Sequence, residues 1–233
     1  MKIELSIIIP AYNEEKNISI LLKSIKQQKL NNYEIIVADA DSNDDTAKIA
    51  KNSGCKIVLG GLPAKGRNNG SKEAKGEILL FLDADTRLPK NFLKKNLKEF
   101  EKRKLDLAGV KILPNSKKKI DYLSYGAYNL WQKAMQKIDP HLSGCCIFIK
   151  KNVFFKLKGF DEDLIVAEDH ALARKAHKNK YNFGILSEKI VVSTRRLEKE
   201  GRIKVLSKLV FFWFRRLFKE IKKSNVKYEL KNR

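Results

Sequence analysis

The chain has 233 residues, 43% of them hydrophobic, a composition that is ordinary for a globular protein and outside the range of disordered ones. Its 49 Lys and Arg against 27 Asp and Glu give a net charge of +22, which leaves nucleic acid, anionic lipid and phosphorylated compounds as candidate partners. The longest apolar run, 209–214, is far shorter than the roughly 20 residues of a spanning helix, and no signal-peptide pattern is visible. We therefore expect a cytoplasmic protein that does not cross a bilayer.

The three cysteines do not form a recognisable framework. Cys145 and Cys146 are adjacent, and neither they nor Cys55 belong to a Cys-x-x-Cys pair, so a disulfide scaffold and a zinc site are both disfavoured. We interpret all three as small apolar residues of a protein kept in a reducing compartment.

Strands and helices alternate through the first hundred residues. Asn13 is the expected N-cap of a first helix whose apolar side is Ile18, Leu21, Leu22 and Ile25. Short strand–helix–strand units require right-handed crossovers, which predicts an α/β fold: a mainly parallel, Rossmann-like sheet with helices on both faces. The predicted strands of this half are 4–10, 34–39, 56–59 and 77–82, and residues 66–74 form a predicted helix.

The second half of the chain is less regular. Strands are predicted at 107–113, 147–149 and 190–192, and helices at about 122–136 and 167–177. No internal repeat or linker is found, and the one boundary we mark lies near Gly201, where a basic tail begins.

Acidic residues follow two of the predicted strands. Asp39 ends one strand, and Asp83 and Asp85 follow the apolar strand 77–82. Parallel sheets bind ligands at the carboxyl ends of their strands, and two carboxylates at a spacing of two can hold Mg²⁺ or Mn²⁺. The alternative for the pair is an exposed acidic turn. For Asp39 the alternatives are a turn aspartate and an acceptor for a nucleobase N–H.

Three further charged residues have both a functional and a plain interpretation. Arg67 offers a guanidinium fork suited to phosphate or to the acidic pair, although a surface arginine is the simpler interpretation. Glu168 and Asp169 open a predicted helix, where a carboxylate is favoured by the helix dipole. The functional interpretation of Asp169 is a general base that accepts a proton from a hydroxyl.

Taken together, six motifs resemble the family-2 glycosyltransferases, which have the GT-A fold. They occur in the family's order over about residues 4–178. In this chain they read Ser6-Ile7-Ile8-Ile9-Pro10-Ala11-Tyr12-Asn13-Glu14-Glu15, Ile36-Val37-Ala38-Asp39 with Ser42-Asn43-Asp44-Asp45-Thr46, Arg67-Asn68-Asn69-Gly70, Asp83-Ala84-Asp85, Gly159-Phe160-Asp161-Glu162 and Glu168-Asp169.

The resemblance implies a role for each matched position. Asp169 would be the base of an inverting displacement, and Asp85 with Asp83 would bind Mg²⁺ or Mn²⁺. Arg195 and Arg196 resemble a basic loop that closes over the diphosphate in some members. The residues implied to hold the nucleotide-sugar donor are Pro10, Tyr12, Glu14, Asp39, Arg67, Asp83, Arg195 and Arg196, and those on the acceptor side are Asp161, Glu162 and Glu168.

The same resemblance divides the chain and refines its expected activity. Residues 1–200 would be the catalytic domain, with 1–105 as its nucleotide-binding half and 106–200 as its acceptor half, followed by the tail 201–233. The sequence departs from the family where Asp39-Ala40-Asp41 replaces two acidic residues and a glycine. No Gln-x-x-Arg-Trp motif is present, which favours transfer of a single sugar over processive synthesis.

The tail has its own pattern. From 195 to 233 there are 14 basic and 4 acidic residues, and the apolar and basic residues of 203–223 fall on opposite sides of a helical wheel. Such a helix either lies on an anionic membrane surface or packs back on the domain. Membrane attachment would be peripheral, on the cytoplasmic face, and would suit a polyprenyl phosphate or glycolipid acceptor.

Two other functions compete with sugar transfer. A sugar-phosphate nucleotidyltransferase would need a glycine-rich loop after the first strand, and Ala11-Tyr12-Asn13-Glu14-Glu15 contains no glycine. A basic nucleic-acid-binding protein would suit the charge of +22, but the predicted acidic cleft would repel phosphates and no zinc-finger or RNA-recognition signature is found. We therefore expect no nucleic-acid partner.

Overall fold

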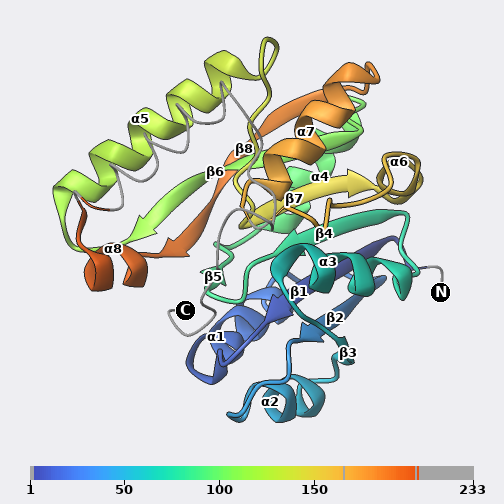
Figure 1. Cartoon of the computed structure of the whole chain (residues 1–233), viewed down its shortest axis with the longest axis vertical. Helices are drawn as coiled ribbons and strands as arrows, with labels where there is room; N and C mark the ends of the chain where they lie inside the picture. Colours follow the sequence, from blue (N-terminus) through green and yellow to red (C-terminus); the bar gives the residue numbers. More distant parts are fainter. Residues whose placement is uncertain (1–2, 165, 203, 205–233) are drawn as a thin grey trace.

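The computed structural model describes residues 3–164, 166–202 and 204. In this part of the chain a single sheet has the strand order β3-β2-β1-β4-β7-β6-β8-β5 (Figure 1). The strands are β1 Leu5–Ala11, β2 Tyr33–Asp39, β3 Lys56–Leu59, β4 Ile78–Leu82, β5 Thr86–Arg87, β6 Leu107–Asn115, β7 Cys146–Lys150 and β8 Phe183–Ser193. The helices are α1 Glu15–Lys26, α2 Thr46–Asn52, α3 Pro63–Lys72, α4 Phe92–Lys102, α5 Lys119–Met135, α6 Lys151–Lys156, α7 Glu168–Lys178 and α8 Arg195–Glu200.

Most strands of the sheet run in one direction. Strands β1 to β4 are parallel, β7 is antiparallel to both β4 and β6, and β8 is parallel to β6. Only β7 and β5 therefore oppose the rest of the described sheet. The predicted mainly parallel sheet is confirmed, and the carboxyl ends of β1, β2, β4, β6 and β8 lie along the same edge.

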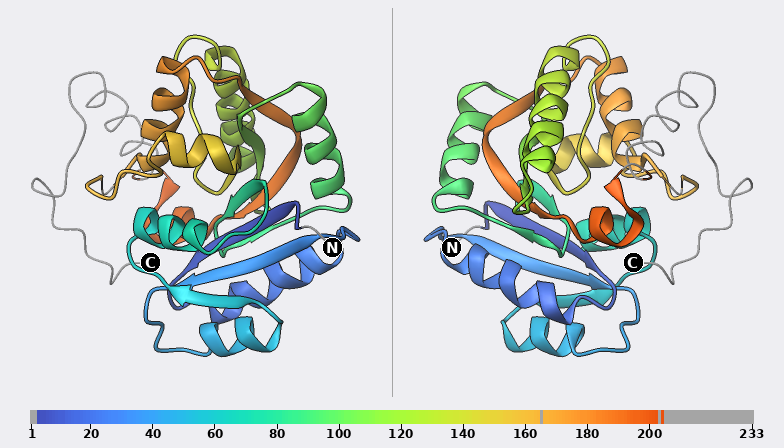
Figure 2. Two further views of the ribbon diagram at one scale, coloured as in Figure 1. Left: turned by 90° about the vertical axis from the view of Figure 1, so that its right-hand side faces the viewer. Right: turned by 90° about the vertical axis from the view of Figure 1, so that its left-hand side faces the viewer.

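Successive side chains of the central strands point to opposite faces of the sheet, so each face has its own hydrophobic core. Ile7 and Ile9 of β1 belong to the core that includes apolar residues of α1 and α4, whereas Ile8 belongs to the core formed with α3, α6 and α7. Figure 2 shows α1 and α2 on one side of β1 and β2, with α3 on the other side. Helices on both faces were predicted and are confirmed.

The structure corrects several local expectations. The N-cap position of α1 is Glu14, whereas Asn13 has a left-handed backbone with φ 53° and accepts a hydrogen bond from the Asn43 N–H. Helix α3 begins at Pro63 rather than at residue 66, because proline suits the first turn of a helix. Arg195 and Arg196 lie in α8 and not in a loop.

The remaining expectations concern the cysteines and the tail. Cys55 and Cys146 are buried, Cys145 is partly exposed, and all three are free thiols. The predicted amphipathic helix over 203–223 falls outside the described residues apart from Lys204. Among the helices of the described chain, none combines the length and the apolar character that crossing a membrane requires.

Candidate functional site

Arg67 of α3 joins carboxylates from both halves of the chain. Its Nη2 donates to Asp83 Oδ1 at 2.8 Å and to the Gly144 carbonyl at 3.2 Å, and its Nη1 donates to Glu168 Oε1 at 2.6 Å. The side chain is only 3% exposed. The plain interpretation of Arg67 as a surface arginine is therefore wrong. Burial acts to lower the pKa of Arg67, but the negative charges of Asp83, Glu168 and Asp169 outweigh it and raise the pKa above the ordinary value, so the guanidinium stays charged.

The close approach of α3 to the sheet brings Arg67 to this position. A Cβ on Gly70 would lie 2.5 Å from Ile8 Cγ2, and a Cβ on Gly66 would lie 3.4 Å from the Pro10 Cβ. Only glycine lets the helix backbone lie this close to β1. The motif Arg67-Asn68-Asn69-Gly70 thus combines a packing residue with a functional one.

Asn68, the neighbour of Arg67, is hydrogen-bonded to the turn at residues 160–162. Its Nδ2 donates to the Phe160 carbonyl and to Glu162 Oε1, each at 2.9 Å, and its Oδ1 accepts from the Phe160 N–H at 3.0 Å. Glu162 is thereby fixed against α3. Asp161 instead turns back on its own loop and accepts from the Asp163 N–H.

A second cluster surrounds Asp85. Arg195 Nε lies 3.3 Å from Asp85 Oδ2, and the same guanidinium makes a two-point contact with the Glu14 carboxylate. Glu14 itself is buried, and its backbone N–H donates to Thr46 Oγ1 at 2.7 Å. Residues more than 180 positions apart in the sequence therefore meet beside the end of β4.

The electrostatics of Asp85 follow from this crowding. Burial raises its pKa to about 6, with further contributions from Asp83 and Glu14, and Arg195 opposes the rise. The local excess of negative charge is thus only partly balanced by the protein.

Asp169 lies at the start of α7, on the other side of Arg67. Ala167, the N-cap residue of α7, has a left-handed backbone with φ 66°, an uncommon conformation for alanine. Burial raises the pKa of Asp169 to about 6, and the repulsion of Asp83 adds to it, while Arg67 and the hydrogen bond from the His170 N–H lower it. A side chain at position 144 would come within 3.0 Å of Asp169 Oδ2, so Gly144 keeps the space beside this carboxylate open.

Glu168 has a different environment from its neighbour. It is 14% exposed and bonded to Arg67, and burial is the main reason that its pKa is raised. A carboxylate fixed by a guanidinium is a poor proton acceptor, because the proton would have to displace that contact. Of the two residues, Asp169 is therefore the better candidate base.

For three other predicted site residues in the described part of the chain, Asp39, Tyr12 and Arg196, the structure gives no hydrogen bond or ion pair to Arg67, Asp85 or Asp169. Asp39 ends β2 and accepts from the Ser42 hydroxyl at 2.6 Å and from the Ser42 N–H at 3.0 Å, as a turn aspartate does. Tyr12 is half-buried directly after β1. Arg196 pairs with Glu200 of its own helix and has a side chain that is 63% exposed.

Sequence reasoning missed several residues near the two carboxylates that follow β4. The carbonyl of Cys145 accepts from the Asp83 N–H at 3.1 Å. Burial raises the pKa of Tyr125 in α5 to about 12, and electrostatic interactions with Cys145, Asp121 and Asp85 add to the rise. The rings of His141 and His170 are 4.9 Å apart beside Asp169. Only the position of His170 next to Asp169 gave a signal in the sequence.

The donor set beside β4 fits a divalent cation. Asp83 and Asp85 offer hard oxygen atoms, and a cationic guanidinium already lies 3.3 Å from Asp85. Within the described ranges, no group of three or more His, Cys, Asp and Glu could hold a metal ion. An ion held by these two carboxylates alone would need water and phosphate oxygens to complete its shell, as is usual for Mg²⁺.

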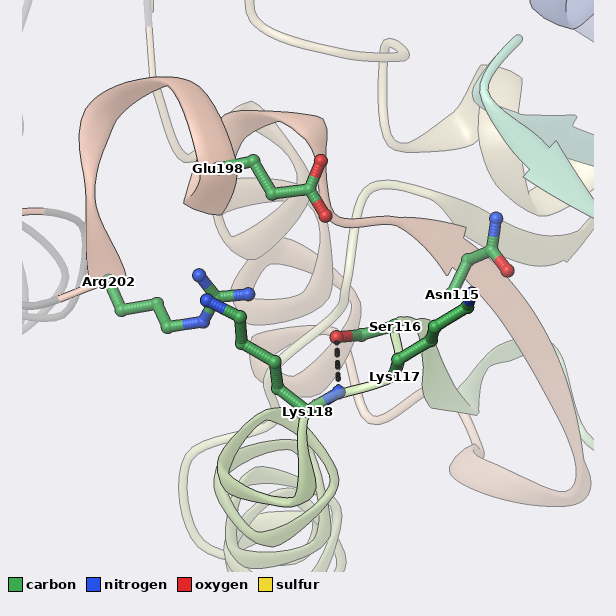
Figure 3. A pocket seen from close by; sticks show the side chains of 6 residues that line it. All are labelled: Asn115, Ser116, Lys117, Lys118, Glu198 and Arg202. Carbon is green, nitrogen blue, oxygen red and sulfur yellow. Dashed lines mark hydrogen bonds between the residues drawn. The ribbon is translucent and has the colours of Figure 1, made fainter.

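A separate pocket of about 390 Å³ lies between the end of β6, the start of α5 and α8. Figure 3 shows its lining, in which Lys118 lies beside Arg202, Lys117 points away from both, and Glu198 comes from α8. The remaining lining residues are Asn115 and Ser116.

The chain is similar to a family of known proteins in both sequence and fold. The profile of "Glycosyl transferase family 2" matches residues 6–157. The poly(ribitol-phosphate) beta-N-acetylglucosaminyltransferase TarS of Staphylococcus aureus is 28% identical over 212 residues, which are 84% of this chain and 36% of that protein. This chain thus spans little more than a third of that relative's length.

Two further proteins share part of the sequence or the fold. A beta-1,3-glucosyltransferase of Escherichia coli, WfgD, named for a diphosphoundecaprenol acceptor, is 41% identical over 86 residues, 34% of each chain. The crystal structure of TarS 1-349 with UDP-GlcNAc has a TM-score of 0.67 at 25% identity and covers 82% of this chain and 58% of that one. A mannosyltransferase of Pyrobaculum calidifontis with GDP-Man and Mn²⁺ also has a TM-score of 0.67, at 23% identity over 82% of this chain and 57% of its own.

Proposed function

The chain belongs to glycosyl transferase family 2, and on that premise we propose that it moves one sugar from a nucleotide-sugar donor to an acceptor hydroxyl or phosphate with inversion at the anomeric carbon. Membership in the family makes the chain a glycosyltransferase. Inversion, the need for a metal and the acceptor class belong to the proposal.

The observation that carries the proposal is that carboxylates lie on two sides of Arg67, with Asp83 and Asp85 on one side and Asp169 on the other. Asp83 and Asp85 follow a strand of the nucleotide half, whereas Asp169 begins a helix of the acceptor half, and Arg67 bonds to Asp83 and to Glu168 beside Asp169. A base on one side of a donor and a leaving-group site on the other is the arrangement that direct displacement requires.

Asp169 takes the proton in this scheme. An oxygen of the acceptor attacks the anomeric carbon, and its proton passes to a carboxylate oxygen of Asp169. The bond between that carbon and the diphosphate breaks on the opposite face, and the electron pair leaves with the nucleoside diphosphate. Gly144 leaves room beside Asp169 for the acceptor, and a base of this kind accelerates a reaction about 10²–10⁴-fold.

The leaving diphosphate binds beside Asp83 and Asp85, on the side of Arg67 opposite to Asp169. Asp83 and Asp85 would hold Mg²⁺ or Mn²⁺, and the chemistry supplied there is Lewis-acid neutralisation of the departing charge. Arg195, which bonds to Glu14 and lies against Asp85, is close enough to the same place to bind a phosphate oxygen. Pro10, Tyr12 and Asp39 follow or end the neighbouring strands, where we assign the nucleoside.

A lipid-linked acceptor is the class that we favour. WfgD, which shares 86 aligned residues, is named for a diphosphoundecaprenol acceptor. TarS is named for a poly(ribitol-phosphate) acceptor, so a phosphate-bearing polymer is the alternative class. Residues 203–223, whose pattern is basic and amphipathic, would suit an acceptor held at a membrane surface.

Donor calorimetry tests this function. UDP- and GDP-sugars should be titrated with and without Mn²⁺ into the natural chain, Asp85→Asn, and the exposed control Asp163→Asn. We expect one donor to bind with metal, Asp85→Asn to lose most of the metal dependence, and the control to behave as the natural chain. Equal binding by Asp85→Asn and the natural chain would remove Asp85 as a ligand. The anomeric configuration of the product, read by NMR, tests inversion separately.

A further inference from the structure

Helix α5 is amphipathic in the reverse of the usual sense. The residues it buries are polar, namely Asp121, Asn129 and Gln132. A helix on the surface of a globular protein ordinarily buries its apolar side and exposes its polar side. Figure 1 shows α5 running along one end of the molecule beside β6, with no other labelled element beyond it.

Each buried polar side chain of α5 has a partner. Asn129 bonds to both backbone groups of Ile112 in β6, at 2.9 and 2.8 Å, and Gln132 Nε2 donates to the His141 carbonyl at 3.0 Å. Asp121 is held by Ser116 and by Arg202. The inner side of α5 is therefore fixed by hydrogen bonds, and several of its large apolar residues are exposed instead.

The outward side, which we call the outer face of α5, is unusually apolar. Leu123 and Leu130 are 70% and 71% exposed, and Ile120 and Tyr122 are also exposed. Ile138, in the turn that follows the helix, is 73% exposed. These five are the majority of the eight large hydrophobic side chains exposed on the described chain. The helical spacing of Ile120, Leu123 and Leu130, with exposed Ala127 between the last two, makes them one stripe. Apolar groups gathered in this way indicate a contact surface.

The exposed charges that flank the outer face in the sequence are mostly positive. Lys117, Lys118 and Lys119 precede its first apolar residue, and Lys133 and Lys137 lie near its end; all five are exposed. The only acidic residues between 117 and 139 are Asp121, which is buried beneath the face, and Asp139, which ends the segment. An apolar stripe edged by lysines is complementary to an anionic lipid surface.

The chain leads from this face into its basic tail. Arg202 Nε and Nη2 bond to the two carboxylate oxygens of Asp121, in the first turn of α5, at 2.7 and 2.8 Å. Arg202, the residue before 203–223, is therefore bonded to the lysine-rich end of α5. Residues 203–223 contain seven Lys or Arg and one Glu among their apolar residues.

We propose that the outer face of α5 lies on the surface of an anionic lipid bilayer, with Ile120, Leu123 and Leu130 in the interface and the flanking lysines on the headgroups. Two copies of the face would bring like charges together, and docking of residues 203–223 would do the same, so charge favours lipid over both. The proposal is independent of the donor chemistry, and its test needs no sugar transfer.

Vesicle partitioning of the full chain provides the test. Sedimentation with phosphatidylcholine vesicles, with and without phosphatidylglycerol, should compare the natural chain, Leu123→Gln/Leu130→Gln, and the control Leu59→Gln, whose site is 72% exposed on β3. We expect binding only to the anionic vesicles, a partition coefficient about tenfold lower for the double variant, and no change for the control. An unchanged partition coefficient for the double variant would overturn the proposal.

A local probe separates the outer face from the tail. An environment-sensitive dye on Ala127→Cys should shift to the blue when anionic vesicles are added, whereas the same dye on Leu59→Cys should not. A shift without vesicles that disappears on removing residues 205–233 would mean that the tail covers the face. A shift that depends on protein concentration alone would mean that a second copy does. Either result would contradict lipid contact.

Discussion

Asp169 and Asp85 are carboxyl groups held away from water, and burial is the largest cause of the pKa of about 6 that each has. A different arginine limits the rise in pKa of each carboxyl group. Arg67 lies beside Asp169, and Arg195 beside Asp85. A pKa near 6 leaves Asp169 ionised at neutral pH and still basic enough to accept a proton.

The pH dependence of transfer follows from Asp169. Because only the ionised carboxylate accepts a proton, kcat at saturating metal and donor should rise about tenfold per pH unit below pH 6 and level off above it. Initial rates between pH 4.5 and 8 measure this, and Asp163→Asn should give the same curve. A rate that is constant from pH 5 to 7 would exclude a base with this pKa.

Arg67 balances charge at a buried site, so its loss should be costly. Arg67→Met would leave Asp83 and Glu168 without their cation, at a cost of about 3–5 kcal/mol in the free energy of unfolding. The matched control Arg196→Met, at a side chain that is 63% exposed, should change that free energy by less than about 0.5 kcal/mol. Urea denaturation of the two variants gives both values, and a similar small effect for both would show that the contacts of Arg67 contribute little.

The same substitution has an electrostatic consequence. Since Arg67 lowers the pKa of Asp169, its removal should raise that pKa further and move the acidic limb of the rate profile to higher pH. A limb that moves to lower pH in Arg67→Met would contradict the assignment of Asp169 as the titrating group.

At the scale of elements, α3 is the helix that joins the two halves. Its glycines lie against β1, while Arg67 and Asn68 reach Glu168 and Glu162 in the second half of the chain. The order of strands and helices was predictable from hydrophobic periodicity because each strand alternates between two cores. The hydrogen bond between Asn68 and Glu162 was not predictable from the sequence, because the two residues are more than 90 positions apart.

Two glycine substitutions test the close approach of α3 to β1. Gly70→Ala would place a Cβ 2.5 Å from Ile8 Cγ2 and should destabilise the fold by about 1–3 kcal/mol. Gly126→Ala in α5 meets nothing within 4 Å and should stabilise the fold by about 0.5–1 kcal/mol, the ordinary gain within a helix. Thermal unfolding should therefore change in opposite directions, and two changes of the same sign would contradict the packing described for α3.

Helix α5 illustrates a limit of sequence patterns. Its position was predicted, but periodicity alone could not tell which side faces inward. The inner side is decided by Ile112, whose backbone groups bond to Asn129 after a register irregularity in β6. Similarly, the helix α8 at Arg195 was not predicted, because its short polar sequence has no apolar periodicity.

At the scale of the whole molecule, the sheet brings distant parts of the chain to one edge. The candidate residues of the nucleotide half were predictable because they follow apolar strands whose carboxyl ends must meet. The pairing of Arg67 with Asp83 was one of the alternatives that the sequence offered, whereas the pairing of Arg195 with Glu14, 181 positions away, was not predictable. The overall charge of +22 coexists with this acidic site because lysines elsewhere, including those around α5, supply it.

The measurement closest to the central claim is a single-turnover assay on Asp169→Asn with donor binding determined in the same sample. The account predicts that donor affinity stays within about twofold of the natural chain while the transfer rate falls by about 10²–10⁴. The exposed control Asp163→Asn should leave both unchanged. A transfer rate in Asp169→Asn within tenfold of the natural chain would show that another group takes the proton.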